Sequence, residues 1–160
     1  MSSSRPAADN PVTAVAWLTR YARTHVRSTF EARQYLRRRG VRPAAIERAM
    51  AACQGRGLLD DSACARLWAS HWARQGYAWA AIRLKLLEKG LSEASIAAAT
   101  EAVDATAAGD AERAHQVLAQ HVSRRSGIAP PRPRLARILA SRGFDSETID
   151  HLLREHTDDQ

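Results

Sequence analysis

A glycine-centred segment that occurs three times constrains the fold of this chain more than any other feature. The copies are "LRRRGVRPAAI" at 36–46, "LEKGLSEASI" at 87–96 and "LASRGFDSETI" at 139–149. Each glycine follows a run of helical period, and glycine readily adopts the left-handed conformation that ends a helix. An arginine or lysine precedes each glycine, where a cation suits the negative end of the helix dipole. The segment therefore predicts three helix–turn–helix corners.

Apolar residues fix the chain direction after each corner. One lies directly after the glycine and an isoleucine follows five positions later, which is the spacing of a hydrophobic staple. The pairs are Val41–Ile46, Leu91–Ile96 and Phe144–Ile149. Ser92 and Asp145 are suitable N-caps for the helices that follow. Arg42 is a poor cap, but Pro43 suits the first helical position.

The repetition extends beyond the corners. Leu18 and Trp68, in two aromatic-rich helical runs, lie 22 residues before the first two glycines. The run "ERAHQVLAQHV" takes this place in the third copy, with extra residues assigned to the loop "SGIAPPRP". A unit of about 50 residues with three helices is typical of a linear array. We expect a disordered basic tail at 1–11 and three-helix repeats at 12–58, 59–107 and 108–156.

Composition favours helices throughout. No strand-like alternation stands out, and alanine, leucine and arginine dominate, so the predicted class is all-α. No apolar run approaches the roughly 20 residues of a membrane-spanning helix. The start "MSSSRPAADNP" lacks the apolar core of a signal peptide. These features predict a soluble, cytoplasmic protein without membrane contact.

The positive charge is concentrated in the first third of the chain. The net charge is +7, and residues 1–57 hold 11 arginines against three acidic residues. An arginine-rich surface suits phosphates or an acidic protein groove. It also fits a merely solvated helix face, although crowded like charges with no interleaved acids disfavour that alternative. The candidate binding residues are Arg33, Arg37, Arg38, Arg39 and Arg42, then Arg83, Lys85 and Lys89, and finally Arg137 and Arg142.

No catalytic or metal-binding motif is found. The six histidines have no metal-ligand spacing, and neither a phosphate-binding glycine loop nor a nucleophile elbow occurs. Asp60 and Asp61 are interpreted as N-terminal acids of the entry helix of the second repeat, and Asp110 likewise in the third. Cys53 and Cys64 have no metal spacing and are expected to be buried, reduced thiols. We expect no enzyme activity, catalytic residue, metal or cofactor.

The tryptophans allow two interpretations. Trp17, like the others, could stack on nucleic-acid bases. Trp68 and Trp72 lie four residues apart and are expected to belong to the core. Trp79 and the nearby Tyr77 are left open between these two roles.

Four segments together resemble the bacterial RecX family of recombination regulators. They are "ARQYLRRRGVRPAAI", "GRGLLDDSACARLWA", "RQGYAWAAIRLKLLEKGLSEASI" and "LARILASRGFDSETI". The likeness runs from about residue 12 to 155, and "GLLDD" followed by the glycine–tyrosine and lysine–glycine motifs is its most specific part. The resemblance implies three tandem three-helix repeats in an elongated, curved array.

The resemblance also implies a partner. Members are expected to bind RecA and RecA filaments on single-stranded DNA, and to inhibit the ATPase, coprotease and strand-exchange activities of RecA. Two other classes remain open. One is a helical protein that binds DNA directly, weakly and without sequence specificity, because three-helix units resemble helix-turn-helix readers. The other is a helical scaffold for a different acidic partner.

Overall fold

The computed structural model describes residues 10–123 and 131–158, and within these ranges every regular element is a helix. The all-α prediction is confirmed. In chain order the helices are α1 (Pro11–Thr24), α2 (Thr29–Arg38), α3 (Pro43–Gly55), α4 (Asp61–Arg74), α5 (Trp79–Glu88), α6 (Glu93–Ala97), the 3-10 helix η1 (Glu101–Val103), α7 (Ala107–Ser123), α8 (Arg132–Ser141) and α9 (Ser146–Asp158).

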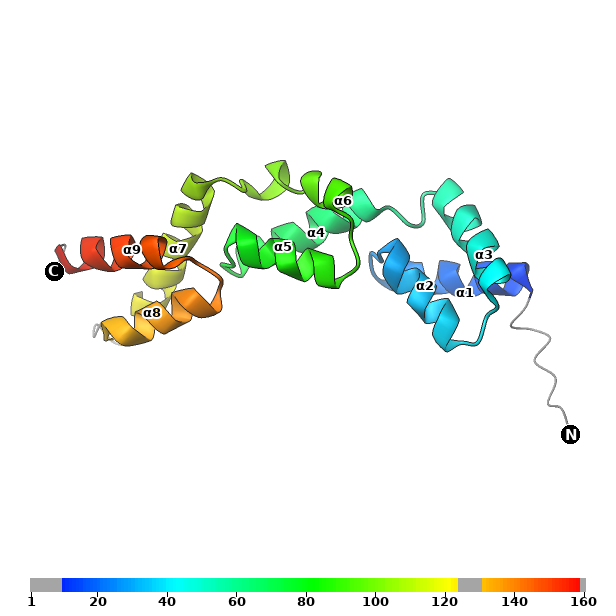
Figure 1. Ribbon diagram of the computed structural model, residues 1–160, viewed down its shortest axis with the longest axis horizontal. Coiled ribbons are helices and arrows are strands. Elements are labelled where there is room, and N and C mark those ends of the chain that lie inside the picture. The colour runs from blue at the N-terminus through cyan, green and yellow to red at the C-terminus, as the bar shows by residue number, and fades with distance from the viewer. Residues whose placement is uncertain (1–9, 124–130, 159–160) are drawn as a thin grey trace, which may run out of the picture.

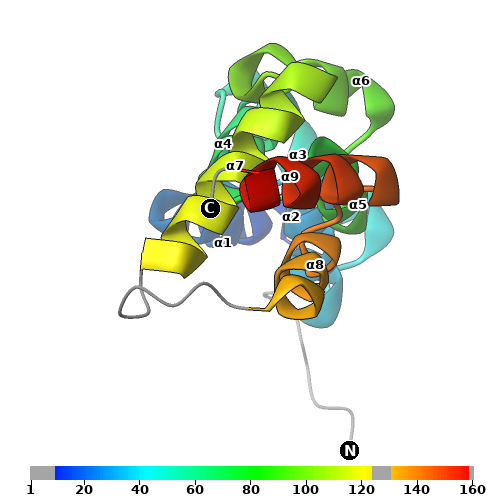
Figure 2. The ribbon, with the colours of Figure 1, turned by 90° about the vertical axis from the view of Figure 1, so that its left-hand side faces the viewer.

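The helices form three groups that follow one another in an elongated row (Figure 1). The groups are α1–α3, α4 with α5, α6 and η1, and α7–α9. Figure 2 looks along the row from its C-terminal end. Each group has its own apolar core, because its amphipathic helices bury their apolar faces against one another. Typical core residues are Leu18, Leu36 and Ile46 in the first group, Ile82, Leu86 and Ile96 in the second, and Leu118, Leu139 and Leu152 in the third.

The three predicted corners have the expected local structure. Gly40, Gly90 and Gly143 have φ angles of 75°, 74° and 85°, in the left-handed region. The backbone N–H of Ser95 donates to the Ser92 side chain at 3.2 Å. Asp145 likewise accepts from the N–H of its third following residue at 2.8 Å. All three staple pairs are buried, each pair within one core.

The third helix of the middle group is shorter than the corner alone suggests. It ends at Ala97, and after η1 the backbone of Asp104 turns into the left-handed region at φ 44°. The guanidinium of Arg113, on α7, donates to the carbonyls of Val103 at 2.6 Å and Asp104 at 3.3 Å. Because the chain is not helical after Val103, these carbonyls are free to accept from the buried guanidinium, which satisfies part of its hydrogen-bonding capacity.

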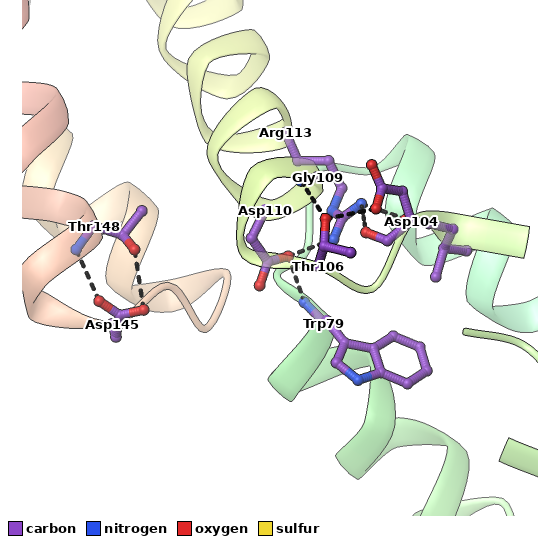
Figure 3. Close-up of polar contacts among 9 residues, drawn as sticks. Trp79, Asp104, Thr106, Gly109, Asp110, Arg113, Asp145 and Thr148 are labelled. Carbon is purple, nitrogen blue, oxygen red and sulfur yellow. Dashed lines mark hydrogen bonds and ion pairs between the residues drawn. The ribbon is translucent and has the colours of Figure 1, made fainter. Parts of the chain in front are cut away.

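Adjacent groups are joined by a carboxylate that caps a helix of the preceding group. Asp61, the first residue of α4, accepts from the backbone N–H and the hydroxyl of Thr29, both at 2.7 Å. Thr29 is the first residue of α2. At the next junction, Asp110 of α7 accepts from the backbone N–H of Trp79, the first residue of α5, at 2.8 Å (Figure 3). The free N–H groups at a helix start make this a favourable place for an acid.

Asp110 lies in the first turn of α7, as the sequence interpretation expects of an N-terminal acid. It also forms an ion pair with Arg113, a contact that the sequence did not indicate (Figure 3). The hydroxyl of Thr106 accepts from the N–H of Gly109 at 3.1 Å and so caps α7. Asp60 does cap its own helix, accepting from the N–H of Ala63 at 2.9 Å.

The glycine corners also contact the preceding group. The carbonyl of Lys89 accepts from the Ser28 hydroxyl at 2.9 Å, and that of Arg142 accepts from the Ala78 N–H at 2.9 Å. A Cβ added to Gly90 would clash with the Phe30 side chain. The second and third corners therefore each end a helix and also pack against the group before them.

Candidate functional site

Two exposed arginines of α2 are the clearest candidates for binding a partner. Arg37 and Arg38 lie in the last turn of the helix. Within the described part of the chain, neither guanidinium forms a hydrogen bond or an ion pair. Arg33, one turn earlier, forms an ion pair with Glu47 of α3. Its charge is thus partly offset within the first group, whereas those of Arg37 and Arg38 are available to a ligand.

Aromatic rings lie beside Arg38, which lines one pocket together with Tyr21 and Tyr35. Tyr21 of α1 stacks on Tyr35 of α2, with ring centroids 4.1 Å apart and planes within 5°. The guanidinium of Arg39 lies 4.8 Å from the ring centroids of both Tyr35 and Trp17. Arg27 lies 4.3 Å from the Tyr21 ring. These distances are within the range of cation–π attraction.

The middle group repeats this arrangement. The Lys89 ammonium lies 4.0 Å from the Trp68 ring centroid. That of Lys85 lies 4.7 Å from the Tyr77 ring and 5.7 Å from the Trp72 ring. Trp68 and Trp72 are half-buried against the middle core, so one face packs in the core and another meets the cations. A tryptophan of this group can therefore pack in the core with one ring face and contact a cation with another.

The two arrangements recur along the chain with nearly equal spacing. Arg39, the C-cap of α2, lies 50 residues before Lys89, the C-cap of α5, and Trp17 lies 51 residues before Trp68. In both groups the ring partners on the first helix are four residues apart, at one turn of spacing. We call these residues the cation–aromatic face. Its members are Trp17, Tyr21, Arg27, Tyr35 and Arg39 in the first group, and Trp68, Trp72, Tyr77, Lys85 and Lys89 in the second.

Arg142 links this face to the third group. Its guanidinium lies 5.2 Å from the ring of Tyr77, which belongs to the middle group. Arg137 is exposed on α8, and Arg42 is exposed at the start of α3. Arg83 of α5 forms an ion pair with Glu93. The structure thus brings Arg39, Lys85, Lys89 and Arg142 onto rings, which the sequence pattern did not reveal.

Lys89 is the candidate most engaged within the chain. Its ammonium donates to Glu31 of the first group at 3.0 Å, and only 21% of its side chain is exposed. Glu31 in turn accepts from the Ser28 N–H at 3.1 Å in the capping box of α2. Lys89 therefore connects the first two groups, while its ammonium also lies over the Trp68 ring.

Trp79 has a different environment from the other tryptophans. It is half-buried and lines a pocket of about 530 Å³ with Thr100, Glu101 and Asp104. The acidic lining makes this pocket unsuitable for a phosphate. Of the two aromatics left open, Tyr77 is therefore the one that joins the cationic surface.

Three further observations concern metal binding, membrane-spanning helices and the reactivity of the two thiols. Across residues 10–123 and 131–158, no cluster of three or more histidine, cysteine, aspartate or glutamate side chains is placed to hold a metal. No helix in those ranges is long and apolar enough to cross a membrane. Cys53 and Cys64 are buried free thiols, as expected. Burial raises the pKa of Cys64 to about 11, which suppresses the reactive thiolate.

The chain is similar to three proteins described as regulatory protein RecX, whereas no protein-family model matches it. That from Leptothrix cholodnii is 32% identical over 96% of this chain and 93% of its own length. The one from Stenotrophomonas maltophilia is 34% identical, covering 97% and 92%. The one from Pseudomonas fluorescens is 34% identical, covering 74% and 75%.

Solved structures share the fold. The crystal structure of RecX from Lactobacillus salivarius matches with a TM-score of 0.73 at 17% identity, covering 91% of this chain and 95% of that one. A second structure, described as regulatory protein RecX, matches with a TM-score of 0.69 at 22% identity, covering 88% and 70%.

Proposed function

The chain belongs to the RecX family of regulatory proteins, and from this we propose that it binds RecA and RecA filaments on single-stranded DNA. Binding inhibits the ATPase, coprotease and strand-exchange activities of RecA, and so modulates recombination and repair. The protein acts in the cytoplasm, where this partner is found. It needs no cofactor and performs no catalysis of its own.

The observation that carries the proposal is the recurrence of the cation–aromatic face in two consecutive groups. The cation Arg39 is followed after 50 residues by Lys89, and the ring of Trp17 is followed after 51 residues by that of Trp68, along an elongated row of helices. A RecA filament displays the same surface of each protomer at regular intervals. An array with repeated contacts gains avidity from several weak interactions made at once. Arg38, which forms no ion pair within the described part of the chain, adds charge beside the Tyr21 and Tyr35 rings of this face.

To inhibit RecA, the chain needs only to occupy a site on the filament. A row of rigid helical groups that lies along the filament groove, or on its end, blocks the relative movement of RecA subunits. The junction contacts of Asp61 and Lys89 support this because they connect adjacent groups. A flexible string of groups would lose more conformational freedom on binding.

A second candidate is direct, non-sequence-specific binding of single-stranded DNA. It is favoured by a pocket of about 360 Å³ that Tyr21, Phe30, Tyr35 and Arg38 line together with Glu31, whose carboxylate is paired with Lys89. Aromatic rings beside a free cation suit a stacked base and its phosphate. On this alternative the chain competes with RecA for DNA instead of binding the filament.

Fluorescence anisotropy of the labelled chain distinguishes the two. RecA filaments assembled on oligothymidylate with a slowly hydrolysed ATP analogue are compared with the same oligothymidylate alone. The filament proposal predicts affinity for the filament at least tenfold above that for bare DNA. Equal affinities, or tighter binding to bare DNA, would favour the direct binder.

A further inference from the structure

A groove on the outside of the first group shares no residue with the cation–aromatic face. It has a volume of about 560 Å³ and runs between α1 and α3. Residues from Pro11 to Arg23 line it on α1. This span is about 18 Å long at the rise of an α-helix, enough to lie against three turns of another helix.

Four arginines surround this groove without acidic partners. They are Arg20, Arg23, Arg48 and Arg56, and all four are exposed. In the described part of the chain, none of their guanidinium groups takes part in a hydrogen bond or an ion pair. The acids of residues 11–58 are Glu31 and Glu47, and both are bound elsewhere, to Lys89 and Arg33. The groove therefore has a positive charge that its own group does not neutralise.

The floor of the groove is apolar. Val12, Val15, Ala16 and Ala52 line it. Val12 is 74% exposed, the highest value among the exposed large apolar side chains of the described residues. Covering this side chain would be favourable, since burial of apolar surface contributes about 25 cal/mol per Å². A phosphate backbone would use the arginines and leave the valines in water.

We propose that this groove binds an acidic segment of a partner protein in which apolar side chains alternate with carboxylates at helical spacing. The carboxylates pair with the arginines, whose planar guanidinium groups favour bidentate contacts. The apolar side chains cover Val12 and Val15. This contact is additional to the RecA-binding face and does not depend on RecA being the partner.

A labelled peptide tests the proposal. The probe is a 12-residue peptide of glutamate and aspartate with leucines at positions 2, 5 and 9, and its control has serines in place of the leucines. We expect the leucine peptide to bind at least fivefold more tightly than the serine peptide. Changing Arg20, Arg23, Arg48 and Arg56 together to glutamine should weaken its binding at least tenfold. The matched control, Arg37→Gln with Arg38→Gln, should leave peptide binding unchanged.

A second variant separates docking from a loss of structure. Val12→Asp changes an exposed side chain, so melting temperature should be retained while leucine-peptide binding falls at least fivefold. Equal affinity for the two peptides would overturn the proposal in favour of a plain electrostatic surface. It would also be overturned if oligothymidylate, and not the peptide, lost affinity for the four-arginine variant. Concentration-dependent self-association that this variant abolishes would identify a second copy as the occupant instead.

Discussion

The carboxylate of Asp61 caps a helix that begins 32 residues earlier, because its two oxygens accept from the N–H and the hydroxyl of Thr29, both at 2.7 Å. Asp110 does the same to the N–H of Trp79 at the next junction. One kind of contact thus connects successive helical groups. It places the N-terminus of each second helix against the first helix of the following group.

Removal of this contact should loosen the first junction. Asp61→Ala leaves the Thr29 N–H without its acceptor, and we expect a loss of about 1–2 kcal/mol in unfolding free energy. Urea denaturation measures the loss, and hydrogen exchange should show faster exchange at the Thr29 amide. Asp60→Ala is the matched control, since it removes only the local cap of α4. Unchanged protection of the Thr29 amide in Asp61→Ala would contradict the assignment.

Gly90 should tolerate alanine less well than Gly57. Both have positive φ angles, of 74° and 67°, so both substitutions incur the left-handed penalty of about 1–2 kcal/mol. A Cβ at Gly57 meets nothing within 4 Å, whereas one at Gly90 would clash with Phe30. We therefore expect Gly90→Ala to cost at least about 1 kcal/mol more. Thermal unfolding measures the stability loss of each variant. Adding Phe30→Ala to Gly90→Ala should recover part of the extra loss. Equal losses at the two glycines would exclude close docking of the second corner.

Cys64 predicts a loss of stability at alkaline pH. Burial raises the pKa of its thiol from 9.0 to about 11, so the folded state favours the protonated form. The stabilisation that results is fully present below pH 9 and is lost as the pH rises toward 11. The difference in unfolding free energy between wild type and Cys64→Ala should shrink across this interval. A constant difference from pH 8 to pH 11 would show that the thiol titrates normally.

Local signals made the corners predictable. Gly90 and Ser92 lie within three residues of each other, and the glycine conformation and the serine cap depend only on nearby backbone. The same holds for Pro43 at the start of α3. Burial of the staple pair Leu91–Ile96 also follows from local spacing.

Contacts between distant segments were not predictable in the same way. Asp110 has the sequence context of an ordinary first-turn acid, yet its carboxylate accepts a hydrogen bond from the backbone N–H of Trp79, 31 residues away. Lys89 looks like a surface cation in a helical last turn, but it pairs with Glu31 from the preceding group. Arg113 resembles a solvated helix residue and is only 7% exposed. Each of these roles depends on how successive groups dock, a geometry that repeat spacing does not specify.

The cation–aromatic face had a partial sequence signal. The spacing of four between Trp68 and Trp72 predicts that both lie on one helix face, and Lys85 and Lys89 are evident as basic residues. What joins them is the packing of α4 against α5, which sets the lysines over the rings. Helical periodicity describes one helix at a time, so it predicts the faces of α4 and α5 separately. It does not predict that these two faces contact each other.

Loss of Arg37 and Arg38 should weaken filament binding without unfolding the chain. Arg37→Gln with Arg38→Gln keeps good helix formers at exposed positions, so melting temperature should change little. If both contact phosphates, the slope of log affinity against log salt should fall by about 1.4, from about 0.7 per contact on single strands. Anisotropy titrations across salt measure this slope. Arg66→Gln with Arg74→Gln removes the same charge from exposed positions of α4 and should have a smaller effect. Identical binding by wild type and the Arg37 and Arg38 variant, at every salt concentration, would exclude these residues from the contact.

RecA ATPase activity on single-stranded DNA, titrated with this chain, tests inhibition of the filament most directly. Binding along or at the end of the filament predicts inhibition well below one chain per RecA, since one bound array affects several subunits. The inhibition should persist when excess single-stranded DNA is added, and it should weaken in the Arg37→Gln, Arg38→Gln variant. Undiminished ATPase activity at equimolar chain would contradict the proposed function, and full recovery with excess DNA would show that the chain acts on DNA instead.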